Sequence, residues 1–106
     1  MLVVRRAALA LLAVTALAGP GMAQDKVTVA VTAIVEHPAL DAARDGIKAA
    51  LAEAGYVDGQ NLTFVYESAQ GNPATAAQIA RKLVGEAPAV IVPISTPSAQ
   101  AVVGAT

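Results

Sequence analysis

The sequence contains no cysteine and few aromatic residues, and both shortages limit what the protein can be. None of its 106 residues is cysteine, which excludes disulfide bonds, thiolate metal ligands, cysteine nucleophiles and a lipidated cysteine behind a leader. Aromatic residues make up 3% of the chain, and tryptophan is absent. The folded part must therefore be stabilised by packing in its core and not by covalent cross-links.

Motifs for metals and nucleotide cofactors are also missing. His37 is the only histidine, so it has no second histidine or cysteine with which to hold zinc. The sequence contains neither Gly-x-Gly-x-x-Gly nor Gly-x-x-x-x-Gly-Lys, the glycine-rich loops that bind dinucleotides and triphosphates. We expect no cofactor and no metal site.

The first 23 residues have the organisation of a secretory signal peptide. A basic start, Met1–Arg6, precedes an apolar run from Ala7 to Ala18, which Gly19-Pro20 interrupts before the small residues that end at Ala23. The apolar run is about a dozen residues long, whereas a membrane-spanning helix needs roughly 20. We predict a signal peptide at 1–23, cleaved after Ala23; the alternatives are an uncleaved anchor and a buried core helix.

Removal of the signal peptide also changes the charge balance. Without Arg5 and Arg6, five basic residues remain against eight acidic ones, so the net charge is −3. This balance offers no basic stripe for phosphate backbones, and we expect no nucleic-acid partner. The expected location is the periplasm.

The rest of the chain, 24–106, alternates between strand and helix patterns. Runs of β-branched and apolar residues predict strands, and three- to four-residue apolar spacing predicts a helix after each strand. A β-α-β-α-β-α order predicts an α/β fold with a Rossmann-like parallel sheet and right-handed crossovers. The first strand is apolar on both faces, as a central strand should be, and the second should lie nearer an edge. The predicted strands are Lys26–Val35, Asn61–Glu67 and Ala89–Ile94; the predicted helices are Ala39–Ala54 behind Pro38, one from Pro73 to about Gly85, and one from Ser95 that turns Val102 and Val103 inward.

Each predicted strand-to-helix junction contains a polar residue followed by proline. These pairs are His37-Pro38, Asn72-Pro73 and Thr96-Pro97; Asn72 and Thr96 are good N-caps and His37 is a poorer one. In a parallel sheet the three helix starts lie at one end, so their free N–H groups can point into one crevice and hold a carboxylate. The best candidate is Ser95–Ser98, where the hydroxyls of Ser95, Thr96 and Ser98 stand beside free amides. Helix capping without any ligand remains open.

Two further side chains at the junctions are candidates for contact with a ligand. Glu36 and His37 could form a general acid/base pair, but adjacent residues project in different directions and no nucleophile motif accompanies them. We therefore favour a role for both in lining a ligand site. Gln70, at the second junction, either hydrogen-bonds a ligand or faces solvent.

The order of these motifs resembles a known family. Val35–Asp41, Gly46-Ile47 with Ala54–Tyr56, Ala69–Asn72 and Thr96–Gln100 resemble the substrate-binding proteins of ABC transporters, whose characterised members include binders of tryptophan and other aromatic amino acids. The likeness runs from about Val27 to the last residue.

This resemblance implies a fold, a function and a set of site residues. The fold is that of a type I periplasmic binding protein, with two Rossmann-like lobes, of which 24–106 corresponds to the first half of lobe 1. The implied function is non-enzymatic: a monomer that captures an amino acid or a similar carboxylate-bearing solute and delivers it to a membrane permease. Half a lobe cannot enclose a ligand, so 24–106 alone should not bind one. An exported α/β enzyme and a ligand-sensing lobe are the alternatives. Together with the chemistry of the junctions, the resemblance predicts that the ligand-binding residues are Glu36, His37, Gln70, Ser95, Thr96 and Ser98.

Overall fold

The computed structural model describes residues 26–106, in which strands and helices alternate as the sequence predicts. The expected signal peptide and its cleavage site lie outside the described residues. The predicted fold class is confirmed, and the ends of the elements agree to within two residues. The elements are β1 (Val27–Ala33), α2 (Pro38–Glu53), β2 (Leu62–Ser68), α3 (Pro73–Glu86), β3 (Val90–Ile94) and α4 (Thr96–Ala105).

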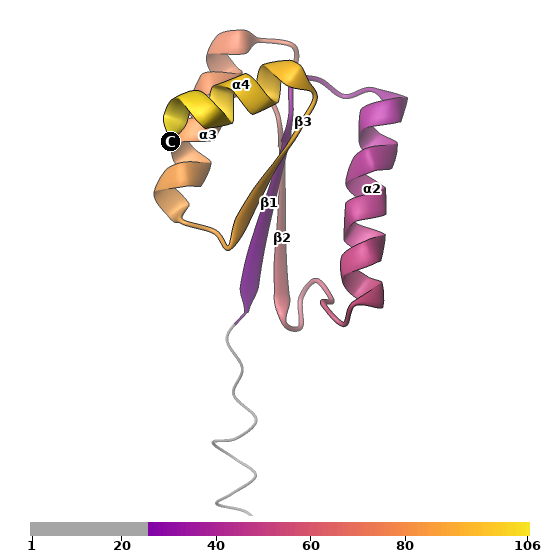
Figure 1. The fold of residues 1–106 in the computed structure, drawn as a ribbon. Coiled ribbons are helices and arrows are strands. Elements are labelled where there is room, and N and C mark those ends of the chain that lie inside the picture. The colour runs from indigo at the N-terminus through magenta and orange to yellow at the C-terminus, as the bar shows by residue number, and fades with distance from the viewer. Residues whose placement is uncertain (1–25) are drawn as a thin grey trace, which may run out of the picture.

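The sheet formed by these strands is parallel and has the order β2-β1-β3 (Figure 1). β1 is central, as its apolar sequence predicts, and its residues from Val29 to Ala33 are all buried. The prediction that this strand continues to Val35 is wrong. Ala33 pairs with Ser68 and with Ile94, the last residues of β2 and β3, so the backbone beyond Ala33 has no strand partner.

Helices cover both faces of the sheet, with α2 on one face and α3 and α4 on the other (Figure 1). Successive residues of a strand point to opposite faces, so β1 contributes to two separate cores. One core lies beneath α2, and the other lies beneath α3 and α4. The buried residues of the first are Val29, Val31, Ala33, Leu62 and Ile94; those of the second are Ala30, Ala69, Ala76, Ile79 and Leu83.

The inward face of α4 is narrower than expected. Val102 is 9% exposed, whereas Val103 is 73% exposed, so the prediction that both face inward is wrong for Val103. Neighbouring residues of an α-helix lie about 100° apart around its axis, so Val103 can face solvent while Val102 faces the core. None of the helices among residues 26–106 is long and apolar enough to span a membrane.

Candidate functional site

The strand-to-helix junctions meet at one end of the sheet, since all described strand pairs are parallel. In the order β2-β1-β3, the chain leaves β1 toward one face of the sheet, into α2, and leaves β3 toward the other face, into α4 (Figure 1). Such a divergence between neighbouring strands is a topological switch point, where open α/β sheets bind ligands. The junctions at Glu36–Pro38 and Ser95–Ser98 flank this point, and the junction at Gln70–Pro73 follows the outer strand β2.

The starts of α2 and α3 are capped as predicted. His37 is the N-cap of α2, and its Nδ1 accepts a hydrogen bond from the backbone N–H of Ala39 at 3.1 Å. Asn72 is the N-cap of α3, and its Oδ1 accepts from the N–H groups of Ala74 at 2.8 Å and Thr75 at 3.2 Å. The amides of the first turn of α3 are therefore partly occupied by the chain itself.

The start of α4 is different, and the prediction that Thr96 is its N-cap is wrong. The N-cap is Ser95, Thr96 is the first helical residue, and no side chain caps the helix. The backbone of Ser95 has φ 79° and ψ 161°, a conformation almost restricted to glycine, which costs on the order of 1–3 kcal/mol in other residues. With Ser95 as the N-cap, α4 begins at Thr96, and its first amides have no side-chain acceptor among the described residues.

The three hydroxyls of this junction do not lie side by side. Ser95 and Thr96 are exposed, whereas Ser98 is 1% exposed, and its Oγ has no hydrogen-bond partner among the described residues. A buried hydroxyl without a partner costs about 1–3 kcal/mol. The third junction therefore combines backbone strain, an uncapped helix N-terminus and an unsatisfied buried hydroxyl within four residues.

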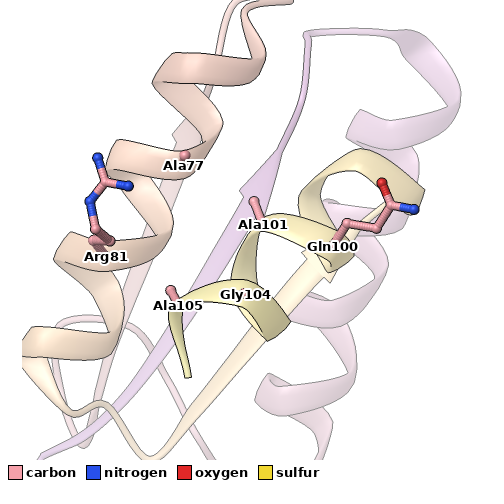
Figure 2. Close-up of a pocket in the computed structure, with 6 residues that line it drawn as sticks. All are labelled: Ala77, Arg81, Gln100, Ala101, Gly104 and Ala105. Carbon is pink, nitrogen blue, oxygen red and sulfur yellow. The ribbon is translucent and has the colours of Figure 1, made fainter.

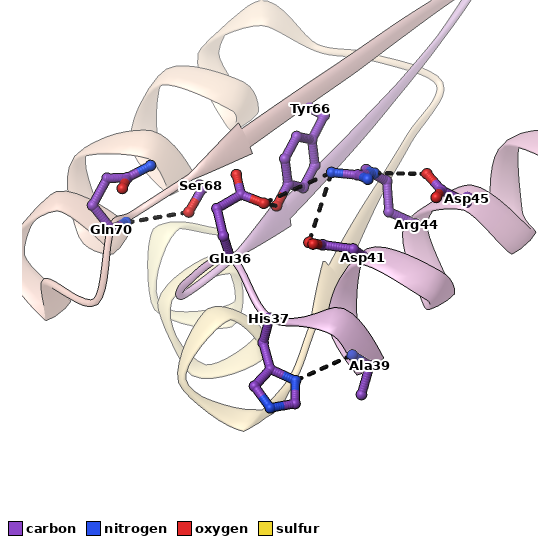
Figure 3. A network of polar contacts seen from close by, with 9 residues as sticks. All are labelled: Glu36, His37, Ala39, Asp41, Arg44, Asp45, Tyr66, Ser68 and Gln70. Atoms are coloured by element: carbon purple, nitrogen blue, oxygen red, sulfur yellow. Dashed lines mark hydrogen bonds and ion pairs between the residues drawn. The ribbon is translucent and has the colours of Figure 1, made fainter.

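Glu36 lies in a polar network that sequence reasoning missed (Figure 3). The hydroxyl of Tyr66 donates a hydrogen bond to Glu36 Oε2 at 3.3 Å, and Arg44 Nη1 lies 3.8 Å from the same oxygen. The guanidinium of Arg44 also lies over the Tyr66 ring, 4.7 Å from its centroid. Arg44 pairs in addition with Asp45 at 2.9 Å and with Asp41 at 3.7 Å. No local sequence pattern indicates this network, because Glu36 and Tyr66 are 30 residues apart.

Two pKa values are shifted within this network. The hydrogen bond to Asp45 is the main cause of a raised pKa at Arg44. Burial, followed by the negative charge of Glu36, raises the pKa of Tyr66. Tyr66 therefore stays protonated at neutral pH and can donate to the carboxylate.

The remaining candidates, His37 and Gln70, do not join this network. The His37 ring points away from Glu36 (Figure 3), as expected for adjacent residues. Gln70 is exposed and adopts a left-handed backbone with φ 55°, and its N–H donates to Ser68 Oγ at 3.2 Å. Its neighbour Gly71 donates to the carbonyl of Ile34 at 2.6 Å, so a backbone hydrogen bond joins the first and second junctions.

A surface hollow of about 380 Å³ lies elsewhere, between α3 and α4 (Figure 2). None of the predicted site residues lines it. Its lining residues are Ala77, Arg81, Gln100, Ala101, Gly104 and Ala105.

Within residues 26–106, acidic residues and the histidine form no group that could hold a metal ion.

Comparison with known proteins finds several chains similar to this one. A tyrosine-binding protein of Clostridioides difficile (strain R20291) is 42% identical over 78 residues, which are 74% of this chain and 23% of that protein. A crystal structure of a conserved domain protein from Vibrio cholerae is 58% identical, with a TM-score of 0.76 over 77% of this chain and 28% of that one. The ABC domain of Streptococcus pneumoniae in complex with L-Trp is 33% identical, with a TM-score of 0.72 over the same shares.

This chain spans about a quarter of the length of these relatives. The family model of ABC transporter substrate-binding proteins matches residues 28–106, which include every described strand and helix apart from the first residue of β1. The resemblance found in the sequence motifs is thereby confirmed. The chain belongs to the family of ABC transporter substrate-binding proteins.

Proposed function

We propose that the protein captures an aromatic amino acid outside the cytoplasmic membrane and presents it to the permease of an ABC importer. Family membership supports capture of a solute. A relative named for tyrosine binding and a related structure that holds L-Trp support the aromatic class. In this proposal the protein acts as a monomer that binds its solute without chemical change.

The observation that carries this proposal is the start of α4 at the switch point. A helix N-terminus attracts anions because its first N–H groups lack partners and its dipole is positive there. The α4 start is the one junction of the described chain without a side-chain cap, so its amides remain free for a ligand carboxylate. Thr96 is exposed at this helix start, and the buried Ser98 hydroxyl, which has no hydrogen-bond partner among residues 26–106, could donate to a ligand oxygen.

We assign the side of the site that faces the start of α4 to the first and second junctions. Glu36, His37 and Gln70 are exposed side chains at the same end of the sheet. We assign them to the lining of the site, with Ser95 fixing the turn across the switch point. The expected location is the periplasm, reached by a cleaved leader at 1–23.

Calorimetry tests the proposal on the protein expressed from its full reading frame. We expect binding of tyrosine, tryptophan or phenylalanine by the wild type. Replacement of Thr96 by valine removes a hydrogen bond to a charged group, and such bonds contribute about 1.5–3 kcal/mol, so the affinity should fall roughly tenfold or more.

The matched control is Thr75→Val, which makes the same change in the first turn of α3, where Asn72 already occupies the amides. It should leave the affinity unchanged. No heat from the wild type with any aromatic amino acid would remove the assigned substrate. Residues 24–106 alone should give no measurable heat, because they form only one side of the proposed site.

A further inference from the structure

Arg44 and Tyr66 come from different elements and converge on one carboxylate oxygen. Tyr66 stands on β2 and Arg44 on α2, and both reach Oε2 of Glu36, at 3.3 Å and 3.8 Å (Figure 3). Glu36 itself lies in the irregular segment between β1 and α2, so its backbone belongs to no described strand or helix. Among the described residues, Tyr66 and Arg44 are the groups that contact its carboxylate and orient it.

Both partners are themselves held in place. The Tyr66 ring packs against the core beneath α2. The Arg44 side chain is 24% exposed, lies over that ring and pairs with Asp41 and Asp45 as well as with Glu36. A planar guanidinium can stack on an aromatic ring and bind carboxylates at its edge at the same time. Two constrained side chains thus act on a third that is 48% exposed.

The charge of this cluster fits a cationic group of a ligand. Three carboxylates surround the single guanidinium of Arg44, so the cluster has an excess of negative charge at the α2 side of the switch point. The uncapped N-terminus of α4 lies across the switch point and favours negative charge. An α-amino acid carries an ammonium group and a carboxylate, which match these two sides.

We propose that Arg44 and Tyr66 are positioning residues, which hold the Glu36 carboxylate in one orientation so that it receives the ammonium group of the bound amino acid. This inference rests on the proposed function and adds two residues to it. Neither residue is required to touch the ligand, because both act through Glu36.

The contact between Tyr66 and Glu36 is tested without any ligand. NMR titration of tyrosines labelled at Cζ gives the pKa of Tyr66, which is assigned by the signal that Tyr66→Phe removes. Burial, Glu36, Asp41 and Arg44 all act on this pKa, and Glu36 raises it. Glu36→Gln should lower it, whereas Glu67→Gln, next to Tyr66 on β2 and paired with Lys82, should leave it unchanged. An unchanged pKa in Glu36→Gln would overturn the inference.

The role in binding is tested with a double-mutant cycle, by calorimetry with the aromatic amino acid that binds the wild type. Tyr66→Phe removes only the hydroxyl and keeps the ring beneath Arg44. Because Tyr66 acts on the ligand only through Glu36, we expect binding to lose part of the contribution of a hydrogen bond to a charged group, which is a loss of affinity of roughly three- to tenfold. If Tyr66 acts through Glu36, the same substitution has no further effect in a Glu36→Gln background. Equal losses in both backgrounds would show that Tyr66 acts independently and would overturn the positioning role.

The two proposals fail in different ways. A wild-type protein that binds no amino acid would refute the proposed function, and with it the role of Glu36 in binding, while the titration would still show whether Tyr66 and Glu36 interact. Binding by the wild type together with additive losses would refute the positioning role alone. Unfolding in urea identifies any variant whose affinity falls because the fold is damaged.

Discussion

Replacement of Ser95 by glycine should stabilise the protein, because it removes strain from the turn between β3 and α4. Ser95 holds φ 79° and ψ 161° and makes no side-chain cap bond that glycine would lose. Relief of the strain is worth about 1–3 kcal/mol, and the greater freedom of glycine in the unfolded chain offsets about 0.4–1 kcal/mol. We expect the free energy of unfolding to rise by about 1.3 kcal/mol, which is the difference between the midpoints of these two ranges, about 2 and about 0.7 kcal/mol.

Urea unfolding of the protein from its full reading frame measures this change. Ser95→Ala is the control for loss of the hydroxyl, since alanine keeps the strain, and it should change the stability by no more than about 0.5 kcal/mol. Thr96→Gly is the control for added flexibility. It places glycine in the first turn of α4, where the backbone is helical, and should destabilise by about 0.5–1 kcal/mol.

The same variant also tests the link between this strain and binding. If the turn holds the first amides of α4 toward a ligand, Ser95→Gly should weaken amino acid binding while it raises stability, the common trade-off at functional sites. A stability that is unchanged or lower in Ser95→Gly would refute the assignment of strain to this residue. Higher stability with unchanged affinity would show that the strain at Ser95 affects the stability of the fold but not ligand binding.

Two further predictions concern the core and the pH dependence of stability. Leu83→Ala should lower the free energy of unfolding by about 2–5 kcal/mol, because Leu83 is fully buried on the inward face of α3. Val103→Ala, on the exposed side of α4, should cost less than about 0.5 kcal/mol by the same urea assay. The backbone N–H of Phe64 is the main cause of a lowered pKa at Asp58, whose ordinary value is 3.8. Asp58 therefore contributes stability above about pH 4, and this contribution is lost as the pH falls through the lowered pKa. Asp58→Asn should make the acid limb of the stability profile shallower, whereas Glu53→Gln should not; equal limbs would refute the Asp58 contact.

The parts of the structure that depend on near neighbours were predictable from the sequence. The order of strands and helices follows from apolar periodicity, and the cap at Asn72 needs only the amides of the next three residues. The central place of β1 follows from its lack of a polar face. Each of these features depends on residues that are close together in the sequence, so local sequence patterns can predict it.

The parts that were missed depend on the sheet. The contact between Tyr66 and Glu36 requires the register of β1 with β2, which no local pattern contains. The positive φ of Ser95 arises where β3 ends beside Ala33, and serine has no intrinsic preference for that conformation. The burial of Ser98 depends on what α4 packs against. The sequence therefore did not show that its hydroxyl is buried while Ser95 and Thr96 are exposed.

The division of β1 between two cores has a consequence for how the site can change. Residues such as Val31 support α2 and the first junction, whereas Ala30, one position away, supports the layer that carries α4 and the third junction. Substitutions at alternate positions of one strand can therefore shift either wall of the site while the other stays in place. For the solute binding proposed above, the width of the switch point and the chemistry of its walls can thus vary independently, so one scaffold could fit solutes of different size.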